Sequence, residues 1–495
     1  MLRLLSLILF LFIPTLALAQ PERHELGRRL RLFEEAWEAQ KDAAIRKEPA
    51  ANMNAAVMLF FGLRLGEAGR ALDQGLVKLQ GIEERDVRLT TNLRCLWLKA
   101  DSHWLELSTK TLKVKVDRFY PLEEPRINEV SYAYSWVPKN KPVVEMTDNS
   151  RVRDDQVIDG VSKTAFIPGE IELTIPEKVG DYTLRFAWKA LGNGEPHIAA
   201  EYCTISLSKN RDQRLSQLKE AVAKWPTPYA TSDEVSVSLN VKVLERLAKG
   251  ETLETDYAAD RLLKECEEAV VAIAKKEPYY HTSKVGQFWM GVQTPTKKIV
   301  PLRIQTVKVK PGQKVPVVLA LHGAGGSENL FFDGYGNGKV AKLAQQKGWF
   351  VVAPRNSLTK AGHAETITEL AKLFPEIDTN QVFVVGHSMG AAEAIREANA
   401  TPGKFAAVAA LGGGGSPKPV KDQGEAFKKL PFYVGVGEND FASSQAEALS
   451  ENLKKAGADE VTFKRYPAIE HMIIVQEALP EVFQFFEVVQ KARTK

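Results

Sequence analysis

The sequence predicts a multidomain chain that ends in an α/β domain built on a mostly parallel, doubly wound sheet. Short apolar runs after residue 314 alternate with helical segments, which is the pattern of a parallel sheet covered on both faces. Apolar and polar residues alternate over residues 110–208, which indicates an antiparallel sandwich, and helical periodicity lies on both sides of this region. With 495 residues, the chain is too long for a single hydrophobic core.

Residues 1–19 have the features of a secretory signal peptide. Arg3 gives a positive start, residues 4–12 are apolar, and Ala17-Leu18-Ala19 forms a cleavage site before Gln20. The apolar run is shorter than the roughly 20 residues that a membrane span needs, so we expect cleavage and not a retained anchor. The mature protein is therefore expected to be secreted or periplasmic, with no membrane span.

Residues 20–108 are predicted to form a helical domain. Apolar residues recur at helical spacing from Leu26 to Trp37, and similar patterns occur at 55–61 and 93–107. Near Thr109 the period changes from about 3.6 residues to 2.

Residues 109–208 are predicted to form a β-sandwich domain. Strand alternation is clearest at 112–116, 171–175 and 182–188. The segment from Pro176 to Tyr182 resembles the turn and tyrosine that open a late strand of immunoglobulin-like modules. An immunoglobulin-like module could contact a polysaccharide or a protein, but the fold does not identify a ligand.

Residues 209–283 return to helical periodicity, with one apolar stripe at Leu215, Leu218 and Val222, and are predicted to be a helical connector. The α/β domain should then occupy residues 284–495. Its first strands, near 288–292 and 302–307, are expected to be antiparallel edge strands of the sheet.

The composition excludes several classes of partner and cofactor. The net charge is +4 and no basic stretch is interleaved with aromatic residues, so we expect no nucleic-acid partner. No His, Cys or Asp cluster has metal-ligand spacing, so neither a metal nor another cofactor is expected. Cys95, Cys203 and Cys266 lie far apart in the sequence and are expected to be free thiols.

The segment Gly386-His387-Ser388-Met389-Gly390 is the most informative motif. It follows the predicted strand 381–385 and precedes the small-residue helix that begins with Ala391. A G-x-S-x-G sequence at a strand-to-helix turn is a nucleophile elbow, in which the sharp turn exposes the serine hydroxyl. Ser388 is therefore the candidate nucleophile for covalent acyl transfer.

A candidate acid and a candidate base follow in the order that such triads require. Asp440 follows the predicted strand 432–436, and His471 follows the predicted strand 461–466. Because parallel strands end at one edge of a sheet, both residues should lie near Ser388. His471 would act as the base and Asp440 would orient it, with His471 within about 3.5 Å of both partners.

Two glutamates bear on this assignment. Glu438 could replace Asp440 as the acid, although it lies closer to the end of its strand. Glu470 precedes His471; it could raise the pKa of the base, but we expect its side chain to point to solvent.

The predicted strand 315–321 runs into His322-Gly323-Ala324-Gly325-Gly326, which has the form of an oxyanion loop. The expected backbone donors to the oxyanion are Met389 and either Ala324 or Gly325. Three aromatic residues follow this loop and either line a substrate pocket or pack in the core: Phe331, Phe332 and Tyr335.

These motifs resemble the lidless esterase, dienelactone-hydrolase and prolyl-oligopeptidase-like branch of the α/β-hydrolase superfamily. The resemblance covers residues from about 285 to 495 and rests on the motifs LHGAGG (321–326), APR (353–355), VVGHSMG (384–390) and GEND (437–440) and on the His471 segment. The whole chain is similar to secreted, multidomain bacterial hydrolases. The resemblance implies a serine hydrolase that cleaves carboxylic esters through an acyl-enzyme.

The sequence leaves the substrate open. Only about 20 residues separate the strands that end near Leu411 and begin at Phe432, so no lid is expected there and an open site would suit bulky or polysaccharide-linked esters. A serine peptidase of the prolyl-oligopeptidase type and a non-catalytic binding protein are the alternatives. Because every residue assigned to the chemistry lies after residue 320, we expect the α/β domain to be active without the sandwich.

Overall fold

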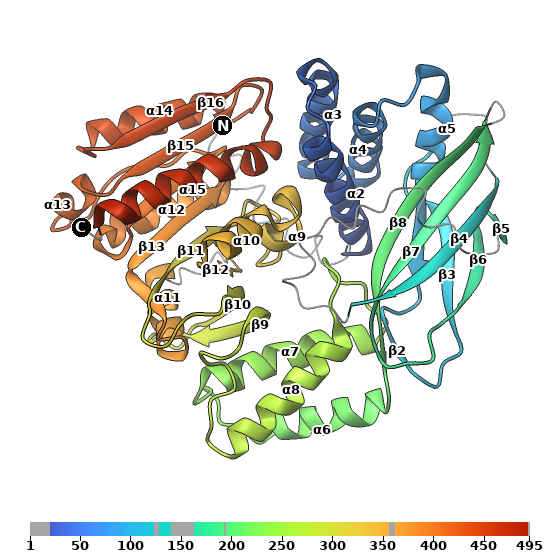
Figure 1. Cartoon of the computed structure of the whole chain (residues 1–495), viewed down its shortest axis with the longest axis horizontal. Coiled ribbons are helices and arrows are strands. Elements are labelled where there is room, and N and C mark those ends of the chain that lie inside the picture. The colour runs from blue at the N-terminus through green and yellow to red at the C-terminus, as the bar shows by residue number, and fades with distance from the viewer. Residues whose placement is uncertain (1–19, 123–127, 140–162, 193–194, 356–361, 494–495) are drawn as a thin grey trace.

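The computed structural model describes residues 20–122, 128–139, 163–192, 195–355 and 362–493 (Figure 1). The predicted signal peptide lies outside these residues. Within the described ranges, no helix is long and apolar enough to cross a membrane.

The amino-terminal helices end earlier than predicted. They are α2 (Gln20–Ala39), α3 (Ala43–Phe61), α4 (Leu65–Leu79) and α5 (Glu84–Arg94). The pattern at 93–107 was wrongly interpreted as a helix, because most of it forms strands β1 (Leu96–Ala100) and β2 (Trp104–Glu106). A short apolar run does not distinguish a helix from a strand, and here pairing with the sandwich decides the outcome.

Two sheets form the β region. One has the order β1-β3-β6, with β3 at Thr111–Arg118 and β6 at Gly169–Thr174. The other has the order β2-β8-β7-β4-β5 and its remaining strands are β4 (Glu129–Pro138), β5 (Lys163–Phe166), β7 (Gly180–Gly192) and β8 (Glu195–Ser208). The described pairings are antiparallel except for β2 with β8. The β region therefore begins at Leu96 and not at 109.

The connector consists of α6 (Arg211–Ala223), α7 (Ser232–Ala248) and α8 (Ala259–Ala274). Helix α7 packs on strand β9 (Gly286–Gln293), the edge of the large sheet (Figure 1). The Asn240 amide donates to the carbonyl of Trp289 at 2.9 Å, and the hydroxyl of Ser236 accepts from the amide of Gly291 at 3.0 Å. These contacts fix the connector to the carboxyl-terminal domain.

The carboxyl-terminal domain has the predicted mostly parallel sheet, with the strand order β16-β15-β14-β13-β11-β12-β10-β9. Its strands after β9 are β10 (Ile299–Thr306), β11 (Val315–Leu321), β12 (Phe350–Pro354), β13 (Ile377–His387), β14 (Ala407–Leu411), β15 (Phe432–Gly437) and β16 (Val461–Tyr466). Only the pairings of β9 with β10 and β10 with β12 are antiparallel, which confirms the predicted antiparallel edge.

Helices cover both faces of this sheet (Figure 1). One face carries α10 (Tyr335–Lys347) and α15 (Ile473–Arg493), and a short helix, α9 (Leu330–Asp333), precedes α10. The opposite face carries α11 (His363–Leu373), α12 (Met389–Ala400) and α14 (Ser443–Lys455). A short helix, α13 (Gly424–Lys428), connects β14 to β15 in the sequence.

The amino-terminal helices share a hydrophobic core with the carboxyl-terminal domain. Phe33 and Trp37 on α2 are fully buried in the same cluster as Tyr335, Phe383 and Phe486. Figure 1 shows α2 between the sandwich and the region of α9 and α10, and α2 contacts α10 directly. The predicted division into separate helical and catalytic domains is therefore not reflected in the packing.

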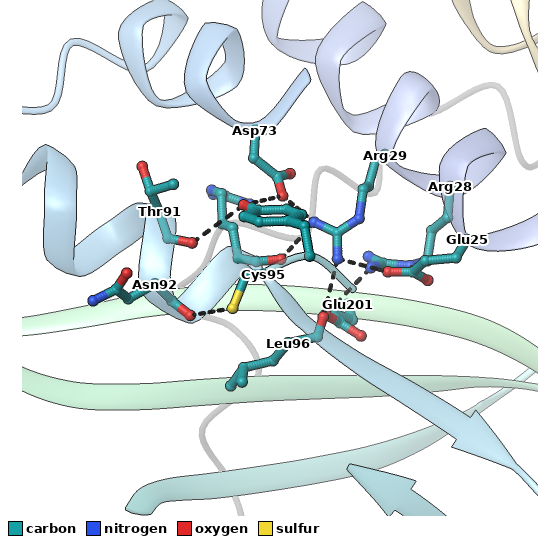
Figure 2. A network of polar contacts seen from close by, with 11 residues as sticks. Glu25, Arg28, Arg29, Asp73, Thr91, Asn92, Cys95, Leu96 and Glu201 are labelled. Atoms are coloured by element: carbon teal, nitrogen blue, oxygen red, sulfur yellow. Dashed lines mark hydrogen bonds and ion pairs between the residues drawn. The ribbon is translucent and has the colours of Figure 1, made fainter. Parts of the chain in front are cut away.

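A buried polar network attaches α2 to the sandwich (Figure 2). Arg28 pairs with Glu25 on the same helix and, at 3.2 Å, with Glu201 on β8. Arg29 is almost fully buried, pairs with Glu25 at 2.8 Å and with Asp73 on α4, and donates to the carbonyl of Leu96 at 3.1 Å. Breaking a buried pair of this kind leaves an uncompensated charge, which typically costs about 3–5 kcal/mol. The network therefore holds α2 in one position.

Candidate active site

Ser388 lies at a tight turn between β13 and α12. Its φ of 55° is in the left-handed region, which a residue with a side chain rarely adopts. A Cβ atom on Gly386 would approach the carbonyl oxygen of Gly390 to well under 3.0 Å, and one on Gly390 would approach the carbonyl oxygen of Leu321 as closely. Both glycines of the motif are thus required by close backbone contact, as in a nucleophile elbow.

His471 is paired with Asp440. The Nδ1 atom of His471 donates to Oδ1 of Asp440 at 2.8 Å, and both side chains are buried. The amide of Ala442 donates to the same oxygen at 2.8 Å. The alternative acid, Glu438, is exposed and accepts from the amide of Ala468. Because Nδ1 carries the proton, Nε2 of a neutral His471 is left as the acceptor.

Aromatic rings hold the imidazole of His471. The Phe441 ring lies 4.1 Å from it and the His387 ring 4.7 Å, measured between ring centroids. Ser388 and His471 line the same cavity, but no hydrogen bond joins them in the described part of the chain. The expected contact with Asp440 is therefore present and the expected contact with Ser388 is not; in structures without substrate, such bonds are often long.

The predicted oxyanion loop lies against the serine. A Cβ atom on Gly323 would lie 3.0 Å from Nδ1 of His387 and 3.3 Å from Cβ of Ser388. Gly323, Ala324 and Gly325 line the cavity together with Ser388. The loop therefore lies close to the serine, beside the cavity in which an ester carbonyl would meet it.

Tyr335 joins the elbow to the segment after the oxyanion loop. His387 is buried, and this burial, followed by the neighbouring His471, holds its pKa well below the usual value, so it is neutral. Nε2 of His387 donates to the carbonyl of His471 at 2.8 Å, so Nδ1 accepts from the Tyr335 hydroxyl at 2.6 Å. Of the three predicted pocket aromatics, Tyr335 lines the cavity, whereas Phe331 and Phe332 pack in the core.

The cavity beside Ser388 has a volume of about 190 Å³. One side is formed by the loops described above, and the other side comes from α2, α3 and α4. The apolar side chains from these helices include Leu26, Leu30, Met53, Val57, Phe60 and Leu72. No lid is inserted between β14 and β15, as predicted; instead, α2, α3 and α4 form one wall of the cavity beside the half-exposed serine, which the sequence did not indicate.

Part of the carboxyl-terminal domain matches a known protein family. Residues 337–482 match the dienelactone hydrolase family. The carboxyl-terminal domain has the α/β-hydrolase fold. No curated protein sequence matches the chain.

Solved structures that are similar to part of this chain include two S-formylglutathione hydrolases and a ferulic acid esterase. An S-formylglutathione hydrolase from Staphylococcus aureus is 16% identical, with 41% of this chain and 99% of that chain covered and a TM-score of 0.34. One from Agrobacterium tumefaciens is 16% identical, with 40% and 94% covered and a TM-score of 0.34. A ferulic acid esterase is 16% identical, with 42% and 98% covered and a TM-score of 0.35.

Helix α2 is attached to the hydrolase domain along its length. At its start, Arg23 donates to the carbonyl of Gly325 in the oxyanion loop. Near its end, the indole of Trp37 donates to Glu477 on α15 at 2.8 Å. Helix α3 adds Phe60, whose ring lies 2.9 Å from the position of a Cβ on Gly325, and Asn54, which donates to the carbonyl of Asn439 at 3.3 Å. The amino-terminal helices therefore contact both the oxyanion loop and the loop that carries Asp440.

Glu34 makes the most specific of these attachments. Its carboxylate accepts from the backbone amides of Tyr335 at 3.0 Å and Gly336 at 3.1 Å. The turn from Tyr335 to Gly338 has φ angles of 51°, 79°, 53° and 70°, all in the left-handed region. Successive amides in such a turn converge on one anion, and here the anion is Glu34 of α2.

The expectation that Glu470 points to solvent is wrong. Its side chain is 0% exposed and accepts from the amides of Met472 at 2.8 Å and Ile473 at 2.6 Å. Burial, with additional repulsion from Asp440 and Glu34, raises the pKa of Glu470 to about 8. The sequence does not show that Glu470 caps α15, because this role depends on where α15 begins. The first amides of a helix need an acceptor at that position.

Other reactive groups lie outside the site. His363 pairs with Glu393 at 2.9 Å. The three cysteines are free thiols, and burial raises the pKa of Cys95 to about 12. In the residues that the structure describes, no group of three or more His, Cys, Asp or Glu is placed to hold a metal ion.

Proposed function

We propose that this protein is a serine hydrolase that cleaves carboxylic esters through an acyl-enzyme intermediate. The observation that carries the proposal is the buried pair of His471 with Asp440, because His471 lines one cavity with the elbow residue Ser388. A buried base with a free acceptor nitrogen beside a strained serine is the arrangement that activates a hydroxyl nucleophile.

In this mechanism Ser388 Oγ attacks the ester carbonyl while Nε2 of His471 takes its proton. Asp440 keeps the imidazole in the required tautomer and stabilises its cation. The amides of Met389 and of Ala324 or Gly325 donate to the oxyanion. His471 then protonates the leaving alkoxide, the alcohol departs, and a water activated by the same imidazole hydrolyses the acyl-enzyme.

The covered cavity favours esters whose acyl part is small enough to enter about 190 Å³. A bulky or polymer-linked alcohol would have to stay outside the cavity mouth. Phe441 is 47% exposed and stacks on His471, so it offers an apolar surface for that part of the substrate.

The test compares the wild type with Ser388→Ala on p-nitrophenyl acetate and butyrate, with Ser416→Ala as a matched control. Ser416 is also a serine in a glycine-rich loop, but it is exposed and outside the cavity. We expect Ser388→Ala to remain folded and to lose on the order of 10⁶ in turnover, and Ser416→Ala to behave as the wild type. Near-native turnover by Ser388→Ala would refute the mechanism.

A proline-containing peptide anilide tests the peptidase alternative in the same assay. Faster hydrolysis of the anilide than of the esters would reassign the activity. A wild type without activity on any of these substrates, and without labelling of Ser388 by a fluorophosphonate, would favour the binding-protein alternative.

We also propose export and an immunoglobulin-like sandwich. Export is supported by the signal-peptide pattern of residues 1–19 and is tested by the mass of the mature chain, which should begin at Gln20. The sandwich assignment is supported by Tyr182, whose hydroxyl donates to the carbonyl of Lys178 at 2.8 Å. Binding of a cell-wall polysaccharide by the mature chain would extend this assignment.

A further inference from the structure

We propose that Gly27 on α2 sets the length of the acyl chain that the active site accepts. The proposal rests on the ester hydrolase function above and adds a substrate class, esters of medium-length aliphatic acids. It assigns substrate selection to the amino-terminal helix and not to the hydrolase domain.

One face of α2 runs along the cavity. Arg23, Leu26, Gly27, Leu30 and Arg31 line it at the helical spacing of three and four residues. Four of these residues carry large side chains, whereas Gly27, at the middle of the row, carries none. The missing side chain leaves free space at the centre of this row, in the cavity that Ser388 also lines.

Packing does not explain this glycine. A Cβ atom on Gly27 would meet nothing closer than an Arg31 nitrogen at 4.0 Å. By contrast, a Cβ on Gly69 of α4 would lie 2.5 Å from Phe119, and one on Gly75 would lie 2.6 Å from Phe33. A helical glycine lowers stability relative to alanine, because it loses more backbone freedom on folding. Gly27 therefore weakens the helix without relieving any contact, and what it provides is cavity volume.

The surroundings indicate an aliphatic and not an anionic ligand. The side chains nearest along the wall are Leu26 and Leu30, and Met53 and Phe60 face them from α3. The charges of the two arginines are already satisfied within the protein. Arg23 bonds the carbonyl of Gly325 and lies near Glu254, and Arg31 bonds Tyr202 and lies near Asp256 and Asp333.

The acyl side of the ester is the part that this wall contacts. During the reaction the acyl group stays bonded to Ser388, whereas the alcohol must leave the site before water can enter. The covered side, formed by α2 and α3, is therefore where the acyl chain must lie for the alcohol to depart.

The test uses Gly27→Ala and Gly27→Leu with p-nitrophenyl esters of two, four, six and eight acyl carbons. We expect Gly27→Leu to keep kcat/KM for the acetate within about threefold of the wild type. It should lower kcat/KM at least tenfold for the longest acyl chain that the wild type accepts, and Gly27→Ala should show a smaller shift. Both variants should unfold at a higher temperature than the wild type, because they remove a helical glycine.

Gly424→Leu is the matched control, since Gly424 is also helical, has nothing within 4 Å of its Cβ position and lies outside the cavity. It should leave the acyl-chain profile unchanged. Equal profiles for the wild type, Gly27→Ala and Gly27→Leu would overturn the proposal. The proposal would also be overturned if the variants changed kcat/KM only in a series of acetate esters with different alcohols. The wall would then contact the alcohol and not the acyl chain.

Fluorophosphonate labelling of Ser388 separates this proposal from the proposed function. If the Gly27 variants are labelled and cleave esters with an unchanged chain-length profile, only the role of Gly27 is overturned, and the hydrolase function stands. A wild type that is neither labelled nor active on esters would overturn the hydrolase function, and with it this inference.

Discussion

Replacing Glu34 by glutamine should make the stability of this protein depend less on pH. Glu34 is 0% exposed and is held by the amides of Tyr335 and Gly336. The charged groups around it are Arg31 on its own helix, Lys342 on α10 and Glu470 before α15. Burial outweighs the amide hydrogen bonds and Arg31, and it raises the pKa of Glu34 from 4.5 to about 7.

The sign and size of the effect follow from this shift. A carboxyl group whose pKa is raised on folding contributes stability that is fully present below pH 4.5 and is lost as the pH rises through about 7. The loss has an upper limit of about 3 kcal/mol, because each pKa unit corresponds to about 1.4 kcal/mol. Glutamine cannot ionise. The free energy of unfolding of Glu34→Gln, minus that of the wild type, should therefore increase by up to about 3 kcal/mol between pH 5 and pH 8.

Urea unfolding of both proteins at pH 5 and pH 8 measures this difference, and Glu48→Gln on α3 is the control because Glu48 is exposed. Glu470 has a raised pKa of the same sign, so the comparison with the wild type is needed to isolate Glu34. A variant that loses more stability at pH 8 than at pH 5 would refute the reasoning, since it would mean that the amides hold the pKa of Glu34 below its usual value.

Two further predictions concern the site and its cover. Asp440→Asn should fold, because asparagine keeps an oxygen for His471 and Ala442, but turnover should fall by about 10⁴ as in comparable triads; wild-type turnover would remove Asp440 from the mechanism. Contrary to the expectation from the sequence, a truncated chain that begins at Asn210 should either be insoluble, as judged by gel filtration, or lack activity in ester assays, because it lacks the cavity wall and exposes Tyr335. A soluble truncated chain with full turnover would show that α2–α4 are dispensable.

The positions of Ser388, Asp440 and His471 could be predicted because each follows a strand of one parallel sheet. Strand ends are a local signal, and the topology of the sheet brings them to one edge. The pairing of His471 with Asp440 instead of Glu438 was also predicted from the position of Glu438 nearer the strand end. In the structure, Glu438 accepts from the amide of Ala468 and does not pair with His471.

The cover over the site could not be predicted in the same way. The amphipathic pattern of α2 shows that one face is buried, but it does not show against what. The contacts of Glu34 with Tyr335 and of Arg23 with Gly325 each cross about 300 residues of sequence and have no periodic signature. The direction of the Glu470 side chain was missed for a similar reason, because it depends on where α15 begins.

The attachment of α2 has a consequence for how the chain folds while it is being synthesised. Helix α2 leaves the ribosome before the carboxyl-terminal domain does, yet Arg23 bonds a residue 302 positions later and Trp37 a residue 440 positions later. Contacts of such separation form slowly and late, and domains that lack them can fold beforehand. The cavity is therefore closed only after α15 has been synthesised, so an incomplete chain has no finished active site. In such a chain the apolar face of α2 also stays exposed, where chaperones can bind it, until α15 docks.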